Sequence, residues 1–234
     1  MKKVFLASVI VLFLGCSKEN PPATSSGLTD LDGNTYTAIT IGKQTWYKEN
    51  LSVSKYSDGT EIPQVNEPSE WATLTTGAWC YYDDDSSSEE VYGKLYNWYA
   101  VAGIFDGPSL NNASLRKKLA PQGHHIPSDS EWTAMSNDLG LNAGGKLKQE
   151  GTDYWYDTND DVTNSSGFNG LPGGICIDNG SFHLVGYHGY WWTSTTSSND
   201  PETALNRSLN YNSNILCKSY DSKNYGFSVR FIKD

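Results

Sequence analysis

The sequence contains no apolar run that could cross a membrane as a helix. Its N-terminal apolar stretch, Val4 to Leu14, is far shorter than the ~20 residues that a transmembrane helix needs. Aliphatic residues are also scarce, whereas the chain has 8 Trp and 15 Tyr, so its core must depend on aromatic rings. This composition is typical of a loop-rich extracytoplasmic β protein and disfavours an enzyme built on a Val-, Ile- and Leu-rich parallel sheet.

The sequence has few positively charged residues. The 234 residues carry 17 Lys and Arg against 27 Asp and Glu, a formal net charge of −10. A chain this acidic repels phosphate groups, which excludes nucleic acid and anionic lipid headgroups as good partners. Attachment to a membrane must therefore depend on a lipid anchor and not on surface charge.

Motifs of common catalytic chemistry are missing. The sequence has neither the HExxH string of zinc proteases nor the GxSxG string of serine hydrolases. His124 and His125 are adjacent, so on a strand they point to opposite faces and cannot bind one metal ion together. We expect a hydrogen-bonded structural role for His125 beside a helix start. The sequence predicts a protein that is not an enzyme, with a hydrolase as the remote alternative.

The N-terminus has the pattern of a bacterial lipoprotein signal. Two lysines precede the apolar stretch, which ends at Gly15 and Cys16. We expect a signal peptide over 1–15 and a lipidated Cys16 that anchors the protein in the cell envelope, on the outer membrane. An ordinary cleaved signal peptide is the alternative. Residues 16–29 then form a polar, flexible tether, and residues 30–234 form one domain.

Three cysteines remain once Cys16 is assigned to the lipid. Cys176 and Cys217 each lie in a short apolar run that is typical of a strand, and an exported protein permits disulfide bonds. We predict a Cys176–Cys217 disulfide, which leaves Cys80 unpaired. The alternative is that Cys176 and Cys217 are buried thiols that act as small apolar side chains.

Periodicity and turn residues predict both helices and strands. A hairpin is expected over 35–47 and a helix over 93–102. A second helix begins at Ser128, which forms a capping box with Glu131. Short strands separated by turns follow over 170–232. Helices in the first half and strands in the second predict an α+β fold.

Several longer strings in this chain form an ordered set. They are DGNTYTAITIGKQTWYKENL (32–51), YGKLYNWYAV (92–101), LAPQGHHIPSDSEWTAM (119–135), NSSGFNGLPGG (164–174), GYWWTSTT (189–196) and YGFSVRFIKD (225–234). Together they resemble the Fibrobacter succinogenes major paralogous domain, a family of exported, often lipid-anchored bacterial proteins. The resemblance covers about residues 30–234.

The resemblance implies a C-type-lectin-like fold, in which two helices flank small, twisted antiparallel sheets and long loops form the surface. It transfers no catalytic residue. Two positions depart from the family pattern: His124 stands where Trp is usual, and Phe231 stands where Cys is usual. Formylglycine-generating enzymes have a lectin-like fold and use reactive cysteines, but the spacing of Cys176 and Cys217 does not resemble theirs.

Acidic residues alternate along one loop in the manner of a calcium site. Asp157, Asn159 and Asp161 offer oxygen ligands. The pattern fails as an EF-hand, because Val162 stands where Gly is required and Phe168 where the bidentate Glu belongs. We expect a solvated loop and no cofactor, with a structural Ca²⁺ as the alternative.

Aromatic side chains are the best candidates for ligand binding. Sugar rings pack their C–H faces on Trp and Tyr, while polar side chains bond their hydroxyls. The candidates are Trp155, Tyr156, Tyr187, Tyr190 and Tyr211.

Most tryptophans must instead be buried, because the core has few aliphatic residues to use. We expect burial for Trp46, Trp98, Trp132 and Trp191.

These observations predict an exported lipoprotein that acts as a non-catalytic binding or adhesion module for carbohydrate or another extracellular polymer. The alternative is a protein-interaction subunit of a cell-surface assembly, whose partner is a surface protein.

Overall fold

The computed structural model describes residues 27–157 and 161–234. The predicted signal peptide, Cys16 and Asn159 lie outside these residues. Within the described part of the chain, no helix combines the length and the apolar composition needed to span a bilayer. Ordered structure begins slightly before the predicted domain start at residue 30, because Leu28 and Thr29 already pair with Tyr36 and Thr35.

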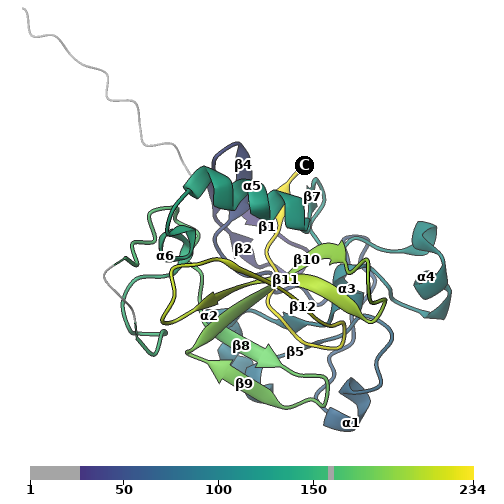
Figure 1. Ribbon diagram of the computed structural model, residues 1–234. Coiled ribbons are helices and arrows are strands. Elements are labelled where there is room, and N and C mark those ends of the chain that lie inside the picture. The colour runs from purple at the N-terminus through teal and green to yellow at the C-terminus, as the bar shows by residue number, and fades with distance from the viewer. Residues whose placement is uncertain (1–26, 158–160) are drawn as a thin grey trace, which may run out of the picture.

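Within the described residues, the strands form four small sheets, and Figure 1 shows how the labelled strands are arranged. A five-stranded sheet has the order β12-β11-β10-β8-β9, and a four-stranded sheet has the order β3-β4-β13-β7. Two-stranded ladders join β1 to β2 and β5 to β6. The strands are β1 Leu28–Thr29, β2 Thr35–Tyr36, β3 Ala38–Ile41, β4 Gln44–Tyr47, β5 Trp79–Cys80, β6 Leu95–Tyr96, β7 His124–His125, β8 Gly173–Cys176, β9 Phe182–Val185, β10 His188–Thr196, β11 Thr203–Asn210, β12 Cys217–Ser222 and β13 Ile232–Lys233.

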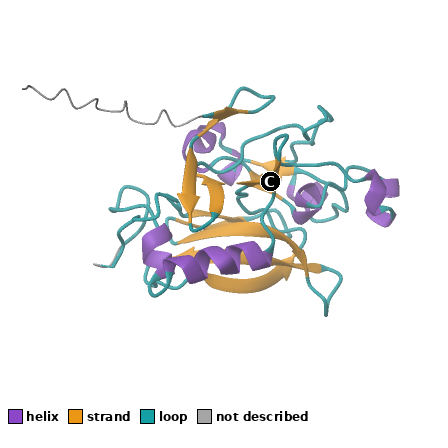
Figure 2. Ribbon diagram, turned by 90° about the horizontal axis from the view of Figure 1, so that it is seen from above, coloured by secondary structure: helices purple, strands orange, loops and turns teal. Residues whose placement is uncertain are grey.

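Strand pairing is antiparallel apart from β8 and β10, which run parallel. The helices are short, and α5 is the longest in the described part of the chain. They are α1 Pro68–Trp71, α2 Glu89–Tyr92, α3 Trp98–Val101, α4 Gly107–Asn111, α5 Asp129–Leu139 and α6 Ala143–Leu147. Figure 2 shows α5 lying across the curved strands, and α5 contacts β3, β10 and β11. Mixed helices and small, mainly antiparallel sheets confirm the α+β prediction at this level.

The capping box of the second predicted helix is present. Ser128 Oγ accepts from the Glu131 amide at 3.4 Å, while the Glu131 carboxylate accepts from the Ser128 amide at 2.7 Å. His125 adds to this helix start, because its Nε2 lies 2.8 Å from Glu131 Oε1 and its Nδ1 lies 2.7 Å from Asp234 Oδ1. The predicted structural role of His125 is confirmed.

The predicted helix over 93–102 is mostly wrong. Leu95 and Tyr96 form β6 instead, and their partners across the ladder are Cys80 and Trp79. The helix starts only after Asn97, whose side chain accepts from the Ala100 amide at 3.0 Å. Tertiary pairing with β5 therefore overrides the helical spacing of the first residues.

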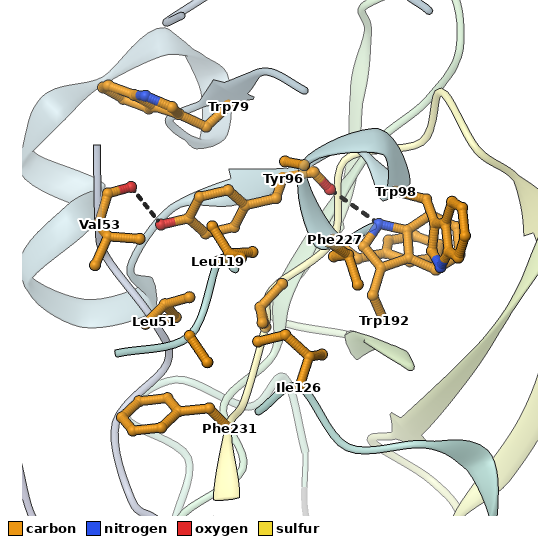
Figure 3. Packing of buried hydrophobic residues seen from close by; sticks show 14 of the residues in the cluster. Leu51, Val53, Trp79, Tyr96, Trp98, Leu119, Ile126, Trp192, Phe227 and Phe231 are labelled. Atoms are coloured by element: carbon orange, nitrogen blue, oxygen red, sulfur yellow. Dashed lines mark hydrogen bonds between the residues drawn. The ribbon is translucent and has the colours of Figure 1, made fainter. Parts of the chain in front are cut away.

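The core is built from aromatic rings (Figure 3). All eight Trp are at most 6% exposed, which confirms the predicted burial of Trp46, Trp98, Trp132 and Trp191. Their indole N–H groups mostly find carbonyls; for example, Trp192 donates to Tyr96 O at 2.9 Å and Trp98 to Thr193 O at 3.0 Å. A ring-based core can thus bury most of its polar N–H groups with a hydrogen-bond partner, and Trp132 is the exception among the described tryptophans.

The predicted Cys176–Cys217 disulfide is not formed. Cys176 is buried at the end of β8, whereas Cys217 is exposed at the start of β12, and both are free thiols. Three strand spacings of about 4.8 Å each separate β8 from β12, whereas bridged cysteines need Cα atoms within roughly 7 Å. Strand order, which local sequence does not reveal, rules out this pair.

Candidate functional site

Three predicted binding residues, Tyr156, Tyr187 and Tyr211, form one group on the surface, which we call the tyrosine cluster. Tyr156 stacks on Tyr187 with ring centroids 4.6 Å apart and planes at 21°. Tyr211 meets both edge-on, at 5.7 Å and 5.5 Å. Tyr156 is 65% exposed and Tyr187 is 38% exposed. Within the described residues, none of the three hydroxyls is engaged in a hydrogen bond, so the cluster offers ring surface and free donors together.

Backbone contacts hold the tyrosine cluster in place. The Tyr156 amide donates to Gly186 O at 2.7 Å, and the Tyr211 amide donates to Tyr187 O at 2.9 Å. Gly186 lies at the β9–β10 turn with φ +82°, a conformation that favours glycine. Three separate loops are therefore joined by main-chain hydrogen bonds before their side chains meet.

A buried lysine supports the same region from inside. Lys148 is fully buried, and its Nζ donates to the carbonyls of Asn210, Tyr211 and Ser213 at 3.1, 3.3 and 2.9 Å. Burial lowers the pKa of Lys148 to about 8. The ammonium group therefore holds together the turn that follows β11 and fixes the backbone that carries Tyr211. Its neighbour in space is Trp155, with Nζ 5.6 Å from the ring centroid.

The prediction that Trp155 binds ligand is wrong. Trp155 is 1% exposed, packs in the core with Trp132 and Phe168, and donates from Nε1 to Gly170 O at 3.2 Å. Its neighbour Tyr156 is exposed because the chain turns outward between them. Sequence adjacency to an exposed ring therefore says little about where a side chain points.

Tyr190 lies apart from the tyrosine cluster, in a groove on one face of the five-stranded sheet. The groove has a volume of about 570 Å³ and takes lining residues from all five strands, together with Ile177 and Tyr225. We call it the sheet groove. Tyr190 stacks between His188, at 5.5 Å and 8°, and Phe227, at 4.9 Å and 11°. Its ring is thus held rigidly at the groove floor.

The groove adjoins the tyrosine cluster. His188 directly follows Tyr187, Asn210 directly precedes Tyr211, and His188 and Asn210 are opposite one another in the β10–β11 ladder. The cluster therefore lies at the end of the groove where β10 begins and β11 ends.

The polar groups that line the groove include one carboxylate and several hydroxyls. Burial lowers the pKa of His188, while burial, helped by Asp221 and Cys217, raises the pKa of Tyr190 to about 12. Both groups are therefore neutral near pH 7. The carboxylate belongs to Asp221, which accepts from Asn206 Nδ2 at 2.7 Å. Ser208, Ser219 and Asn210 add further hydrogen-bonding groups to the groove lining.

Strained backbone marks one wall of the groove. Leu184 on β9 has φ +66° and is 41% exposed. A leucine in the left-handed region costs about 1 kcal/mol or more, and such residues concentrate at functional sites. Exposure of an apolar side chain at this position is likewise unfavourable in water.

The candidate calcium loop is only partly described. Asp161 Oδ2 accepts from Asn214 Nδ2 at 3.0 Å, while Asp157 is the last residue described before Asn159, which lies outside the described residues. Within the described residues, no group of three or more His, Cys, Asp or Glu side chains is arranged to hold a metal ion.

Two titratable groups near the start of α5, Asp129 and His125, form ion pairs. Asp129 accepts from Arg207 at 2.6 Å and from Lys218 at 2.7 Å. Burial alone would raise the pKa of Asp129, but these two partners outweigh it and lower the pKa. His125 is held by Glu131 and Asp234, as described above. These side chains stabilise the contact between α5 and the sheets.

Another cavity, of about 820 Å³, lies elsewhere and is lined mainly by polar residues. Burial alone would raise the pKa of Glu89 in this cavity, but hydrogen bonds from Lys94 and Ser52 outweigh it and lower the pKa. Arg230, also at the cavity, is fully buried and donates to Asn50 Oδ1 at 2.6 Å and to Tyr47 O at 2.7 Å. These groups join separate segments of the chain, so we place the candidate site at the sheet groove and the tyrosine cluster.

Sequence reasoning missed the groove residues His188, Asp221 and Tyr225. The alternation of side chains along a strand could have indicated these residues. His188 and Tyr190 are two residues apart on β10, as Ser219 and Asp221 are on β12, so each pair shares one face of the sheet. That signal becomes useful only when the strand order is known.

Comparison with protein-family models matches residues 39–233 to the Fibrobacter succinogenes major domain. Neither the curated proteins nor the solved structures include a match to this chain.

Proposed function

This chain belongs to the Fibrobacter succinogenes major domain family, and we propose that it is a non-catalytic carbohydrate-binding module. The protein would be exported and attached to the cell envelope through a lipid on Cys16, with a C-type-lectin-like domain displayed on a tether. Its ligand would be a polysaccharide or a similar extracellular polymer.

The observation that carries this proposal is the tyrosine cluster. Three rings from three loops meet at the surface, and one of them, Tyr156, leaves most of its area in water. Burial of exposed ring area against the C–H face of a sugar is favourable, and the free hydroxyls can bond sugar hydroxyls at the edges. Rings held by neighbouring rings lose little conformational freedom on binding.

The sheet groove extends this surface. Tyr190, Asn210, Ser208 and Asp221 provide a ring edge, an amide, a hydroxyl and a carboxylate in a space of about 570 Å³. This set suits a neutral, hydroxyl-rich ligand, and it suits an anionic one poorly, because the groove contains a carboxylate and the whole chain is acidic. A chain of sugar units could therefore lie along the groove and end on the cluster.

The experiment is a glycan and extracellular-matrix array, run with and without a calcium chelator, followed by calorimetry on the strongest hit. Tyr156→Ala and Tyr187→Ala should each weaken binding about tenfold, the loss of roughly one ring–sugar contact. Tyr220→Ala is the matched control, because Tyr220 is a 48% exposed tyrosine outside both the cluster and the groove lining.

The absence of detectable binding to any glycan on the array would count against the proposal. Equal losses of glycan affinity for Tyr156→Ala, Tyr187→Ala and the control Tyr220→Ala would show that the tyrosine cluster has no special role in binding. Capture of one defined surface protein, without glycan binding, would instead favour the interaction-subunit alternative.

A further inference from the structure

Two buried thiols from distant parts of the sequence touch each other. Cys80 on β5 and Cys176 on β8 are each 1% exposed and share a small core cluster with Trp71, Ala78 and Leu95. Cys176 lies close enough to the Cys80 thiol to contribute to the rise in the pKa of Cys80. We propose that Cys80 and Cys176 are joined by a disulfide bond in the mature protein, formed while the chain folds in an oxidising medium.

The backbone imposes this proximity. Cys80 is opposite Leu95 in the β5–β6 ladder. Cys176 is bridged to Gly226, with N···O distances of 3.1 and 2.7 Å. A Cβ atom placed at Gly226 would lie 3.0 Å from the Cys176 Cβ and 3.4 Å from the Leu95 Cβ. Cys176 and Leu95, the cross-strand partner of Cys80, therefore pack against the same glycine, which places both cysteines in one small region of the core.

Cys217 provides an internal comparison. It is exposed on β12, and its Sγ lies 4.0 Å from Ile215 O, with neither of the other two described thiols in its surroundings. We expect it to stay a free thiol while the buried pair is oxidised.

The bond forms by ordinary thiol–disulfide exchange. One thiol loses its proton and attacks a disulfide oxidant, such as oxidised glutathione or an envelope dithiol oxidase, and a mixed disulfide results. The second cysteine, as thiolate, then attacks the mixed disulfide and releases the reduced carrier. In total the two cysteines lose two protons and two electrons, and the oxidant becomes two thiols.

Burial determines when this exchange can occur. It raises the pKa of the Cys80 thiol well above the ordinary value, and it also blocks access of an oxidant to both sulfur atoms. The bond must therefore form before β5 and β8 close over the pair. Protein that has already folded in reductant should oxidise slowly.

The link would join residue 80 to residue 176 and so close a loop of roughly 100 residues, a length for which the stabilisation is large. It would also fix β8, whose Ile175 lines the sheet groove. The inference does not depend on the proposed carbohydrate function.

The test is to refold the full chain in a mixture of reduced and oxidised glutathione, alkylate the free thiols, and map the peptides without reduction. We expect a crosslinked peptide pair containing Cys80 and Cys176, and an alkylated Cys217. The oxidised protein should melt about 5 °C or more above the same protein kept in reductant.

Variants separate the alternatives. In Cys217→Ser the difference in Tm between oxidised and reduced protein should persist, and in the double variant Cys80→Ala with Cys176→Ala it should vanish. If the double variant does not fold, peptide mapping of the wild type still decides. Alkylation of both Cys80 and Cys176 after oxidative refolding, or a crosslink from either to Cys217, would overturn the proposal.

Discussion

Two aromatic groups in this protein have similar ring geometry and opposite surroundings. In the core, Trp132 meets Trp46 at 4.8 Å and Trp191 at 6.3 Å. In the tyrosine cluster, Tyr156 and Tyr187 meet at 4.6 Å. The three tryptophans are completely buried, while the two tyrosines are 65% and 38% exposed.

The difference lies in what covers each group. The tryptophans are on β4, α5 and β10, elements that pack against one another. The tyrosines come from loops and strand ends, where the described part of the chain leaves Tyr156 and Tyr187 partly exposed. Ring–ring contact is therefore a poor guide to function, and exposure together with unpaired hydroxyls separates a binding surface from a core.

The largest expected effect is at the centre of the core. Trp132→Ala should cost about 3–5 kcal/mol of unfolding free energy, because it empties the space among Trp46, Phe168 and Trp191. Denaturant unfolding measures this cost.

Trp132→Phe is the control for that prediction. Within the described residues, the Trp132 indole N–H has no hydrogen-bond partner. Phenylalanine keeps an aromatic ring at this position and removes the unsatisfied N–H donor, so the substitution avoids the desolvation penalty of that donor. Equal losses of unfolding free energy for Trp132→Phe and Trp132→Ala would show that ring packing does not stabilise the core.

A smaller effect is expected where the two regions meet. Lys148→Met should cost about 1–3 kcal/mol, since three buried carbonyls lose their donor. It should also weaken ligand binding, because the backbone of Tyr211 loses its support.

The pH dependence of Lys148 provides a check. Its pKa of about 8 lies below the usual 10.5, so between these values the unfolded chain binds more protons and stability rises with pH. The advantage of the wild type over Lys148→Met should therefore grow above pH 8. A constant difference would mean that Lys148 is not buried as described.

His125 should contribute less, because its side chain is 40% exposed. Burial alone would lower its pKa, but hydrogen bonds to Glu131 and Asp234 outweigh it and raise the pKa above 6.5. The stabilisation by His125 is fully present at pH values below the pKa that His125 has in the unfolded chain. It is lost as the pH rises through the pKa that His125 has in the folded protein.

We expect at most about 1 kcal/mol of stability from this source. The free energy of unfolding is measured at pH 6 and at pH 8 for the wild type and for His125→Gln. The contribution of His125 to the difference between the two pH values should be absent from the variant. An unchanged difference would exclude His125 as its source.

The smallest stability effect is expected in the tyrosine cluster. Tyr156→Ala should change unfolding free energy by no more than about 0.5 kcal/mol, because the side chain is mostly in water. A cost near that of Trp132→Ala would remove the distinction between the two aromatic groups and with it the argument for a binding surface.

Local sequence predicted several parts of this molecule for clear physical reasons. The hairpin of β3 and β4 and the capping box of α5 depend on residues within a few positions of one another. Burial of Trp46 and Trp132 followed from the shortage of aliphatic residues. Three of the five candidate binding residues, Tyr156, Tyr187 and Tyr211, do come together at the surface.

Other predictions failed where distant pairing decides. Trp155 and Tyr156 are neighbours in the chain, yet one is buried and the other exposed. Cys176 contacts Cys80 and not Cys217, because β10 and β11 lie between β8 and β12. Neither outcome has a local signature.

The sequence by itself determined the family, the mixture of helices and strands, and the dependence of the core on rings, because composition and short-range patterns carry that information. Only the tertiary structure decided which rings face water, which cysteines touch and where a groove opens. Those properties depend on strand order and on contacts between segments that are distant in the chain, and such contacts leave no trace in local spacing.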